Sequence, residues 1–256
     1  MALMKTSNPA LGNKTFTDLA NAGQFGDLAD AGRMTLSGTV NKTGVLLLCA
    51  IAMACWTWRL FLQSRDITAV TPYILGGALG GFIVALVTIF KKEWAPVTAP
   101  IYALLEGLAL GGLSALSELR YPGIGIQAVS LTFGTLFVLL LAYSSGLIKV
   151  TDKMRLGIVA ATGGIAVFYV LELLLGFAGI HFTQINGNGA IGIGFSLFVV
   201  AIASLNLVLD FDFIEQGVAV GAPKYMEWYG AFGIMVTLVW LYLEILRLLS
   251  KMRSRN

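Results

Sequence analysis

The stretch VTPYILGGALGGFIVALVTIF, residues 70–90, contains no charged side chain, and Lys91-Lys92-Glu93 follow it directly. A helix needs about 20 apolar residues to cross the hydrocarbon core of a bilayer. This stretch is long enough, and the charges that follow it are typical of a membrane surface. It predicts a transmembrane helix.

Six other runs along the chain have a similar length and composition. With residues 70–90 the runs are Thr43–Leu62, Val70–Phe90, Thr98–Ser117, the residues after Pro122-Gly123 up to Ile148, Leu156–Phe177, Ala190–Ile214 and Trp228–Leu249. Continuous apolar runs indicate helices, because barrel strands alternate in short segments of about ten residues. The fold class is therefore predicted to be an all-α membrane protein, a seven-transmembrane helix bundle.

The composition supports this fold class and excludes several others. Charged residues make up 12% and hydrophobic residues 57% of the 256 residues, whereas soluble domains carry about 25% charged residues. A cytosolic enzyme, a disulfide-rich secreted domain and a disordered regulator are excluded. The net charge of +3 requires no nucleic acid, so the first partner expected is the lipid bilayer.

The polar segments define the predicted domain limits. Residues 1–42 are expected to form a polar cytoplasmic tail, residues 43–250 the seven-helix domain, and residues 251–256 a basic C-terminal tail. Lysine and arginine collect in the loops on the side of the N-terminus, which places that terminus in the cytoplasm. The basic C-terminal tail disagrees with this rule, because seven spans place it outside.

Glycines recur at helical spacing in two of the runs. Gly76, Gly77, Gly80 and Gly81 form two overlapping GxxxG pairs, and Gly107 with Gly111 forms another. Such pairs let helix backbones approach closely. They predict packing faces in a compact bundle and say nothing about chemistry.

The motifs that suggest catalysis or cofactors lack their context. Residues 187–192 match GxGxxG, but a dinucleotide site needs a preceding strand and this match precedes a membrane run. Cys49 and Cys55 lie six residues apart in one run, so they point to different helix faces, and the single histidine, His181, makes no zinc site alone. We expect no enzyme activity and no resident cofactor.

The informative residues are ionisable groups inside the apolar runs. A charge at the bilayer centre costs about 2.5–3.5 kcal/mol on insertion scales, and such groups often mark an ion or proton path. The carboxylates are Glu106, Glu172, Asp210, Asp212, Glu215 and Glu244, with Arg59 and Arg247 as the basic residues.

These candidates do not carry equal weight. Asp210, Glu244 and Glu106 lie deep, which favours a functional role. Asp212 lies two residues from Asp210 and therefore points to a nearly opposite face. For Glu172 and Arg59 a functional and a structural role remain equally open, whereas Glu215 and Arg247 are close enough to run ends to reach the membrane surface.

Four segments resemble the Bax inhibitor-like (transmembrane Bax inhibitor motif) family, in its bacterial branch. They occur in the family's order and are Asn8–Leu11, Ala99–Gly107, Leu209–Glu215 and Leu241–Ile245. The resemblance implies six helices around a central last helix, a bacterial inner membrane location and a pH-sensitive calcium leak. It also implies that Asp210 and Glu244 take the places of the family's paired aspartates, with a glutamate replacing the second. Whether Arg59 takes the place of the family's latching arginine stays open.

The pair suggests a mechanism in which two carboxyls share one proton and hold their helices together. Loss of the proton would set two negative charges in a low dielectric and loosen the helices. The ionised oxygens suit Ca²⁺, with weak binding at Asp210 and Glu244 because few acids converge. The main alternative is a non-conducting regulator that binds other membrane proteins, such as a quality-control protease; a proton-coupled carrier is disfavoured by the absence of inverted repeats.

Overall fold

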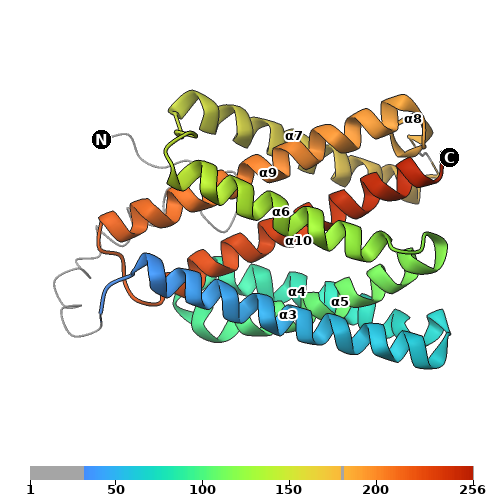
Figure 1. Ribbon diagram of the computed structural model, residues 1–256, viewed down its shortest axis with the longest axis horizontal. Helices are drawn as coiled ribbons and strands as arrows, with labels where there is room; N and C mark the ends of the chain where they lie inside the picture. The colour runs from blue at the N-terminus through green and yellow to red at the C-terminus, as the bar shows by residue number, and fades with distance from the viewer. Residues whose placement is uncertain (1–31, 180–181, 256) are drawn as a thin grey trace.

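The computed structural model describes residues 32–179 and 182–255 (Figure 1). Expectations for His181 and for most of the predicted cytoplasmic tail, residues 1–31, lie outside the described residues.

Seven long helices form the described part of the chain. They are α3 (Leu36–Ser64), α4 (Ile67–Phe90), α5 (Ala95–Arg120), α6 (Ile124–Ser144), α7 (Asp152–Phe177), α9 (Ala190–Ala219) and α10 (Met226–Arg253), with a short 3₁₀ turn η2 (Lys92–Trp94) and a short α8 (Thr183–Asn186). All seven are long and apolar enough to cross a membrane. The predicted all-α membrane bundle is confirmed.

The last helix, α10, lies at the centre of the bundle. It crosses the middle of Figure 1, with α3, α4 and α5 on one side, α7 and α9 on the other, and α6 in front. In the most apolar window of α10, 67% of the residues are buried, against 11% in that of α7. The core is therefore built around α10, and α7 is the helix least embedded in it.

The first helix begins earlier than the hydropathy predicts. α3 starts at Leu36, where the Thr35 hydroxyl accepts a hydrogen bond from the Gly38 backbone N–H at 3.1 Å. The predicted run began only at Thr43, because the first two turns of the helix are polar. Likewise α10 continues to Arg253, into the predicted basic tail.

The glycine pairs do not all pack. A Cβ on Gly77 would lie 2.5 Å from the Leu105 carbonyl oxygen and a Cβ on Gly81 2.7 Å from the Glu106 carboxylate, whereas a Cβ on Gly76 would meet nothing within 4 Å. Gly77 and Gly81 therefore bring α4 onto α5. Gly107 lies against the backbone of Ala50 and Gly111 against that of Ala54, so this glycine pair of α5 packs on α3.

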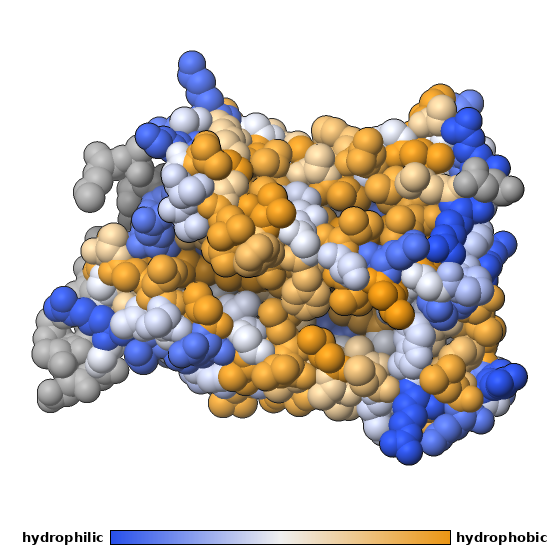
Figure 2. Space-filling view, in the orientation of Figure 1, coloured by the Kyte–Doolittle hydropathy of each residue, from blue (hydrophilic) through white to orange (hydrophobic). Residues whose placement is uncertain are grey.

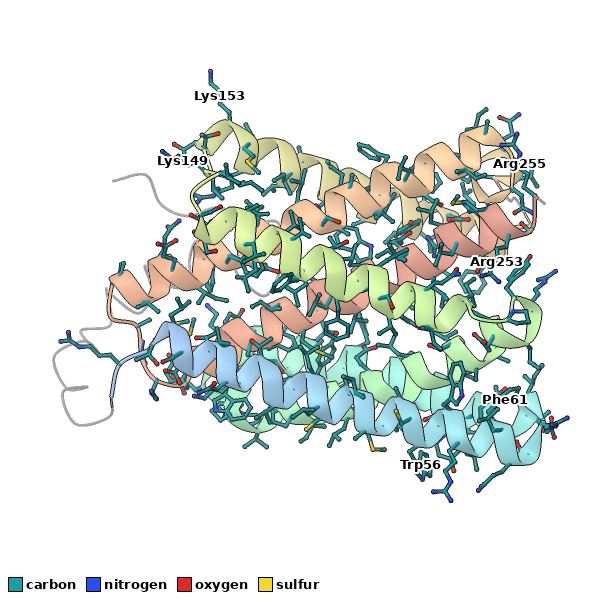
Figure 3. All side chains as sticks on the ribbon, viewed as in Figure 1. Trp56, Phe61, Lys149, Lys153, Arg253 and Arg255 are labelled. Atoms are coloured by element: carbon teal, nitrogen blue, oxygen red, sulfur yellow. The ribbon has the colours of Figure 1, made fainter. Side chains whose placement is uncertain are left out.

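The surface separates into an apolar belt and two polar ends. In the space-filling view, hydrophobic side chains cover the middle of the molecule and hydrophilic ones gather at both ends (Figure 2). Lys149 and Lys153 lie at one end, and Arg253 and Arg255 at the other (Figure 3). This is the distribution expected of a bundle whose long axis crosses a bilayer.

Candidate functional site: a polar line between α7, α9 and α10

Asp210 is fully buried where α9 packs on α10. Its relative exposure is 0%, and its Oδ2 accepts a hydrogen bond at 2.6 Å from the hydroxyl of Thr237 on α10. A carboxyl group removed from water needs such a donor, because an unsatisfied polar group is costly in an apolar interior. The contact ties the two helices of the predicted site together.

One turn earlier on α9, Asn206 connects that helix to α7. Its side-chain amide donates to the Thr162 hydroxyl at 2.8 Å and to the Ile202 carbonyl at 2.8 Å. Asn206 is buried. Because an amide carries no charge, Asn206 is not among the predicted candidates, yet it is the one amide within the run Ala190–Ile214.

Glu244 belongs to a three-residue cluster that joins α10 to α7. Its Oε1 accepts from the Tyr169 hydroxyl at 2.9 Å, and Arg247 Nη1 lies 3.3 Å from both carboxylate oxygens. Arg247 also donates to the Tyr169 hydroxyl at 2.6 Å and stacks over its ring at 5.0 Å. Arg247, expected to reach for the membrane surface, is instead part of this cluster while half of its side chain stays exposed.

The remaining acids of α9 lie towards its C-terminal end. Asp212 forms an ion pair with Arg155 of α7 and accepts from the Gln216 amide at 2.6 Å. Glu215 is exposed and accepts from the Tyr143 hydroxyl of α6. Asp212 and Asp210 thus contact different helices, α7 and α10, as their spacing predicts.

Together these contacts form a line of polar side chains through the bundle. Because α7 and α10 run antiparallel to α9, the contacts succeed one another along the long axis. From the α9 C-terminal end they are Glu215–Tyr143, Asp212–Arg155, Asp210–Thr237, Asn206–Thr162 and Glu244–Tyr169–Arg247. Apart from the first, every contact joins two of the three helices α7, α9 and α10.

Asp210 and Glu244 occupy different levels of this line. Asp210 meets α10 at Thr237, and Glu244 follows Thr237 by seven residues, a rise of about 10.5 Å. The hydrogen bonds described for each carboxyl go to other partners. The two acids predicted as a pair lie on one line, and on α10 Glu244 lies about two helical turns beyond the residue that binds Asp210.

Three predicted residues lie off the line. Glu106 faces Gly81 of α4 and makes no hydrogen bond or ion pair to a described residue. Glu172 accepts from the Asn186 amide beyond the end of α7. Arg59 is exposed on α3, and within residues 32–179 and 182–255 it contacts none of the candidate acids.

A further buried acid, Glu227, escaped the sequence analysis because it follows the loop before α10. It accepts from the Thr35 backbone N–H at 2.9 Å and the Thr35 hydroxyl at 2.7 Å, and forms ion pairs with Lys42 and Lys224. Its side chain has 0% exposure. This cluster fastens the start of α3 to the start of α10.

The described residues offer no preformed metal centre. Within them, no three histidine, cysteine, aspartate or glutamate side chains gather as ligands for an ion. The carboxylate oxygens, which are the atoms that could bind a cation, are instead spread singly along the polar line.

A comparison with models of protein families shows to which family the chain belongs. A family model described as Bax inhibitor 1 like matches residues 8–254. The chain belongs to the Bax inhibitor 1 like family. The resemblance noted from its motifs is confirmed, and the polar line is a feature of a Bax inhibitor 1 like protein. No curated protein and no solved structure matches this Bax inhibitor 1 like chain.

Proposed function

We propose that this Bax inhibitor 1 like protein is a pH-sensitive leak path for Ca²⁺ and other cations, and not an enzyme. The observation that carries the proposal is the polar line. Its acids and their hydroxyl, amide and arginine partners follow one another along the long axis of a mostly apolar bundle. Membrane proteins rarely bury such groups without using them for ions or protons.

In the proposed closed state, the buried acids hold neighbouring helices together. The Thr237 hydroxyl holds the Asp210 carboxyl in place between the two helices. When Asp210 loses its proton, a negative charge appears between α9 and α10 in a low dielectric and weakens the contact between these helices. This mechanism needs acids on a common path, and not the directly shared proton that the sequence suggested.

The helix proposed to move is α7. Only Ile158 and Ile165 of its described residues are buried, so few apolar contacts hold it. Thr162, Tyr169 and Arg155 hold it to the bundle through polar contacts. Two of these three contacts involve a carboxylate, Asp212 or Glu244, so a change in the charge of these acids acts on α7 directly.

The proposed ion is a weakly bound one. Ca²⁺ prefers six to eight oxygen ligands, and Asp210 and Glu244 would each offer only a carboxylate with a few neighbouring oxygens. The lipid bilayer, protons and Ca²⁺ are then the partners, and no resident cofactor is involved.

The test is Ca²⁺ flux into liposomes across a range of pH. We expect Asp210→Asn and Glu244→Gln each to change the flux and flatten its pH dependence, because each removes one acid of the proposed path. Tyr169→Phe should raise the flux, because it removes the hydroxyl that joins α7 to Glu244. Glu93→Gln, at an exposed site outside the line, should match the wild type.

A different result would refute the proposed path. If Asp210→Asn and Glu244→Gln both retain the wild-type flux and its pH dependence, the buried acids do not form an ion path.

One observation favours the second candidate, a non-conducting regulator of other membrane proteins. The Met34 backbone N–H donates to the Ala222 carbonyl at 2.7 Å, and Glu227 binds Thr35. A partner that pulls on the N-terminal segment would thus act directly on α10. Deleting residues 1–31 should abolish such regulation, whereas a leak path would keep its flux.

A further inference from the structure

A polar cavity of about 440 Å³ opens at the end of the bundle where α10 finishes. It lies between the C-terminal ends of α5 and α10 and the segment that joins α8 to α9. Its size falls within the range of small-molecule sites, about 300–1,000 Å³. None of the acids of the polar line contributes to its wall.

The wall of this cavity is positively charged. Arg120, Arg247 and Lys251 line it, together with the amides of Asn186 and Asn188 and the hydroxyl of Ser250, and no carboxylate does. Two acids hold lining residues from outside the cavity, since Glu244 binds Arg247 and Glu172 binds Asn186. Three cations against two acids leave the site with an excess of positive charge.

Lys251 is the residue of the cavity wall that is both buried and held in place by hydrogen bonds. The residue is only 7% exposed, and its ammonium donates to the carbonyls of Ile185 at 2.8 Å and Gly192 at 3.1 Å. An ammonium group has three N–H donors, so two are used and one remains for a ligand. Arg120 makes no hydrogen bond or ion pair to a described residue, which leaves its guanidinium available.

We propose that this cavity binds a phosphoryl anion, supplied either by the headgroup of an anionic lipid or by free phosphate. Arginine forks and ammonium groups match phosphate oxygens in charge and geometry. The cavity lies at the ends of membrane-crossing helices, which is the depth of lipid headgroups. Lysine and arginine in the loops collect at the opposite end of the bundle. A phosphoryl site would explain why basic residues are also present at this end.

The first arm of the test uses lipid. The full chain in detergent is titrated with phosphatidylglycerol or with phosphatidylcholine, and bound lipid is counted by native mass spectrometry. We expect a preference for phosphatidylglycerol that falls about five- to tenfold in Arg120→Gln, the loss of one charge-assisted hydrogen bond at a partly solvated site. Arg65→Gln removes an exposed cation from the same end of the bundle outside the cavity and should keep the preference.

The second arm uses inorganic phosphate against chloride at equal ionic strength, with thermal unfolding as the readout. A rise in Tm that Arg120→Gln reduces would assign the site to free phosphate when the lipid preference is missing. Lys251→Met is a second variant, but it also removes two helix-end contacts. The proposal is overturned if neither probe binds, or if Arg65→Gln loses as much binding as Arg120→Gln. The outcome does not depend on whether the protein conducts ions.

Discussion

At the scale of single residues, buried acids in this bundle have two different environments. Asp210 meets an uncharged hydroxyl, whereas Glu227 meets two ammonium groups and a backbone N–H. Uncharged donors allow a carboxyl group to gain and lose a proton, while paired cations favour the charged form throughout. Glu227 therefore belongs to the structure of the bundle and Asp210 to its proposed function, while Glu244 meets both kinds of partner, the Tyr169 hydroxyl and Arg247.

This distinction predicts the effect of removing the charge of Glu227. We expect Glu227→Gln to lower the free energy of unfolding by about 2–3 kcal/mol, because Lys42 and Lys224 would then lack their counter-ion in a partly buried site. Chemical denaturation in detergent measures the change. Asp152→Asn is the matched control, since that side chain is 80% exposed and lies 3.9 Å from Arg155; a loss there equal to that of Glu227→Gln would contradict the interpretation.

A second residue-scale prediction concerns the donor to Asp210. Thr237→Val keeps the shape of the side chain but removes its hydroxyl, so it should shift the pH dependence of Ca²⁺ flux. Thr237→Ser retains the hydroxyl and should behave as the wild type. Equal pH profiles for the valine and serine variants would show that this hydrogen bond does not control the path.

At the scale of helices, sequence predicts their existence better than their faces and ends. All seven apolar runs became helices, because hydrophobic length alone specifies a span. The first two turns of α3 were missed because they are polar and are held by a cap and by Glu227. Glu244 and Asp210 were correctly placed on α10 and α9, but their separation depends on the register between those helices, which no local pattern contains.

The glycines of α4 give an element-scale prediction. Gly77→Ala should lower stability by about 1–3 kcal/mol, because the new methyl would clash with the backbone of α5. Gly76→Ala adds the same methyl where nothing lies within 4 Å, so it should leave stability unchanged or raise it by up to about 1 kcal/mol. Thermal unfolding in detergent compares the two variants. Equal destabilisation would contradict the packing of the Gly77 face of α4 against α5.

At the scale of the whole molecule, seven spans place the two ends of the described chain on opposite sides of the membrane. Seven spans place the basic C-terminal tail outside, although lysine and arginine usually collect on the cytoplasmic side. The contacts of these basic residues reduce the disagreement. Lys251 binds two carbonyls, and Arg253 donates to the Pro122 carbonyl at 2.6 Å and to the Gln127 side chain at 3.0 Å. Basic residues that bind other parts of the protein are weaker evidence for the orientation of the chain in the membrane than basic residues in exposed loops.

Cysteine labelling tests this topology. In a background with Cys49 and Cys55 replaced by alanine, Lys149→Cys and Arg255→Cys should react with a membrane-impermeant maleimide from opposite sides of sealed vesicles. We propose that Lys149 lies on the cytoplasmic side of a bacterial inner membrane. Labelling of both positions from the same side would mean an even number of spans.

The central position of α10 also determines the order in which the bundle can be assembled. α10 follows the six other long helices in the chain, so a ribosome makes it after them. Until it enters the membrane, the buried faces of α3, α5, α6 and α9 lack the helix against which they pack. The helices α3, α4 and α5 can already pack on one another through their glycines, but a ribosome that stalls before residue 226 would release a product that lacks the centre of the core.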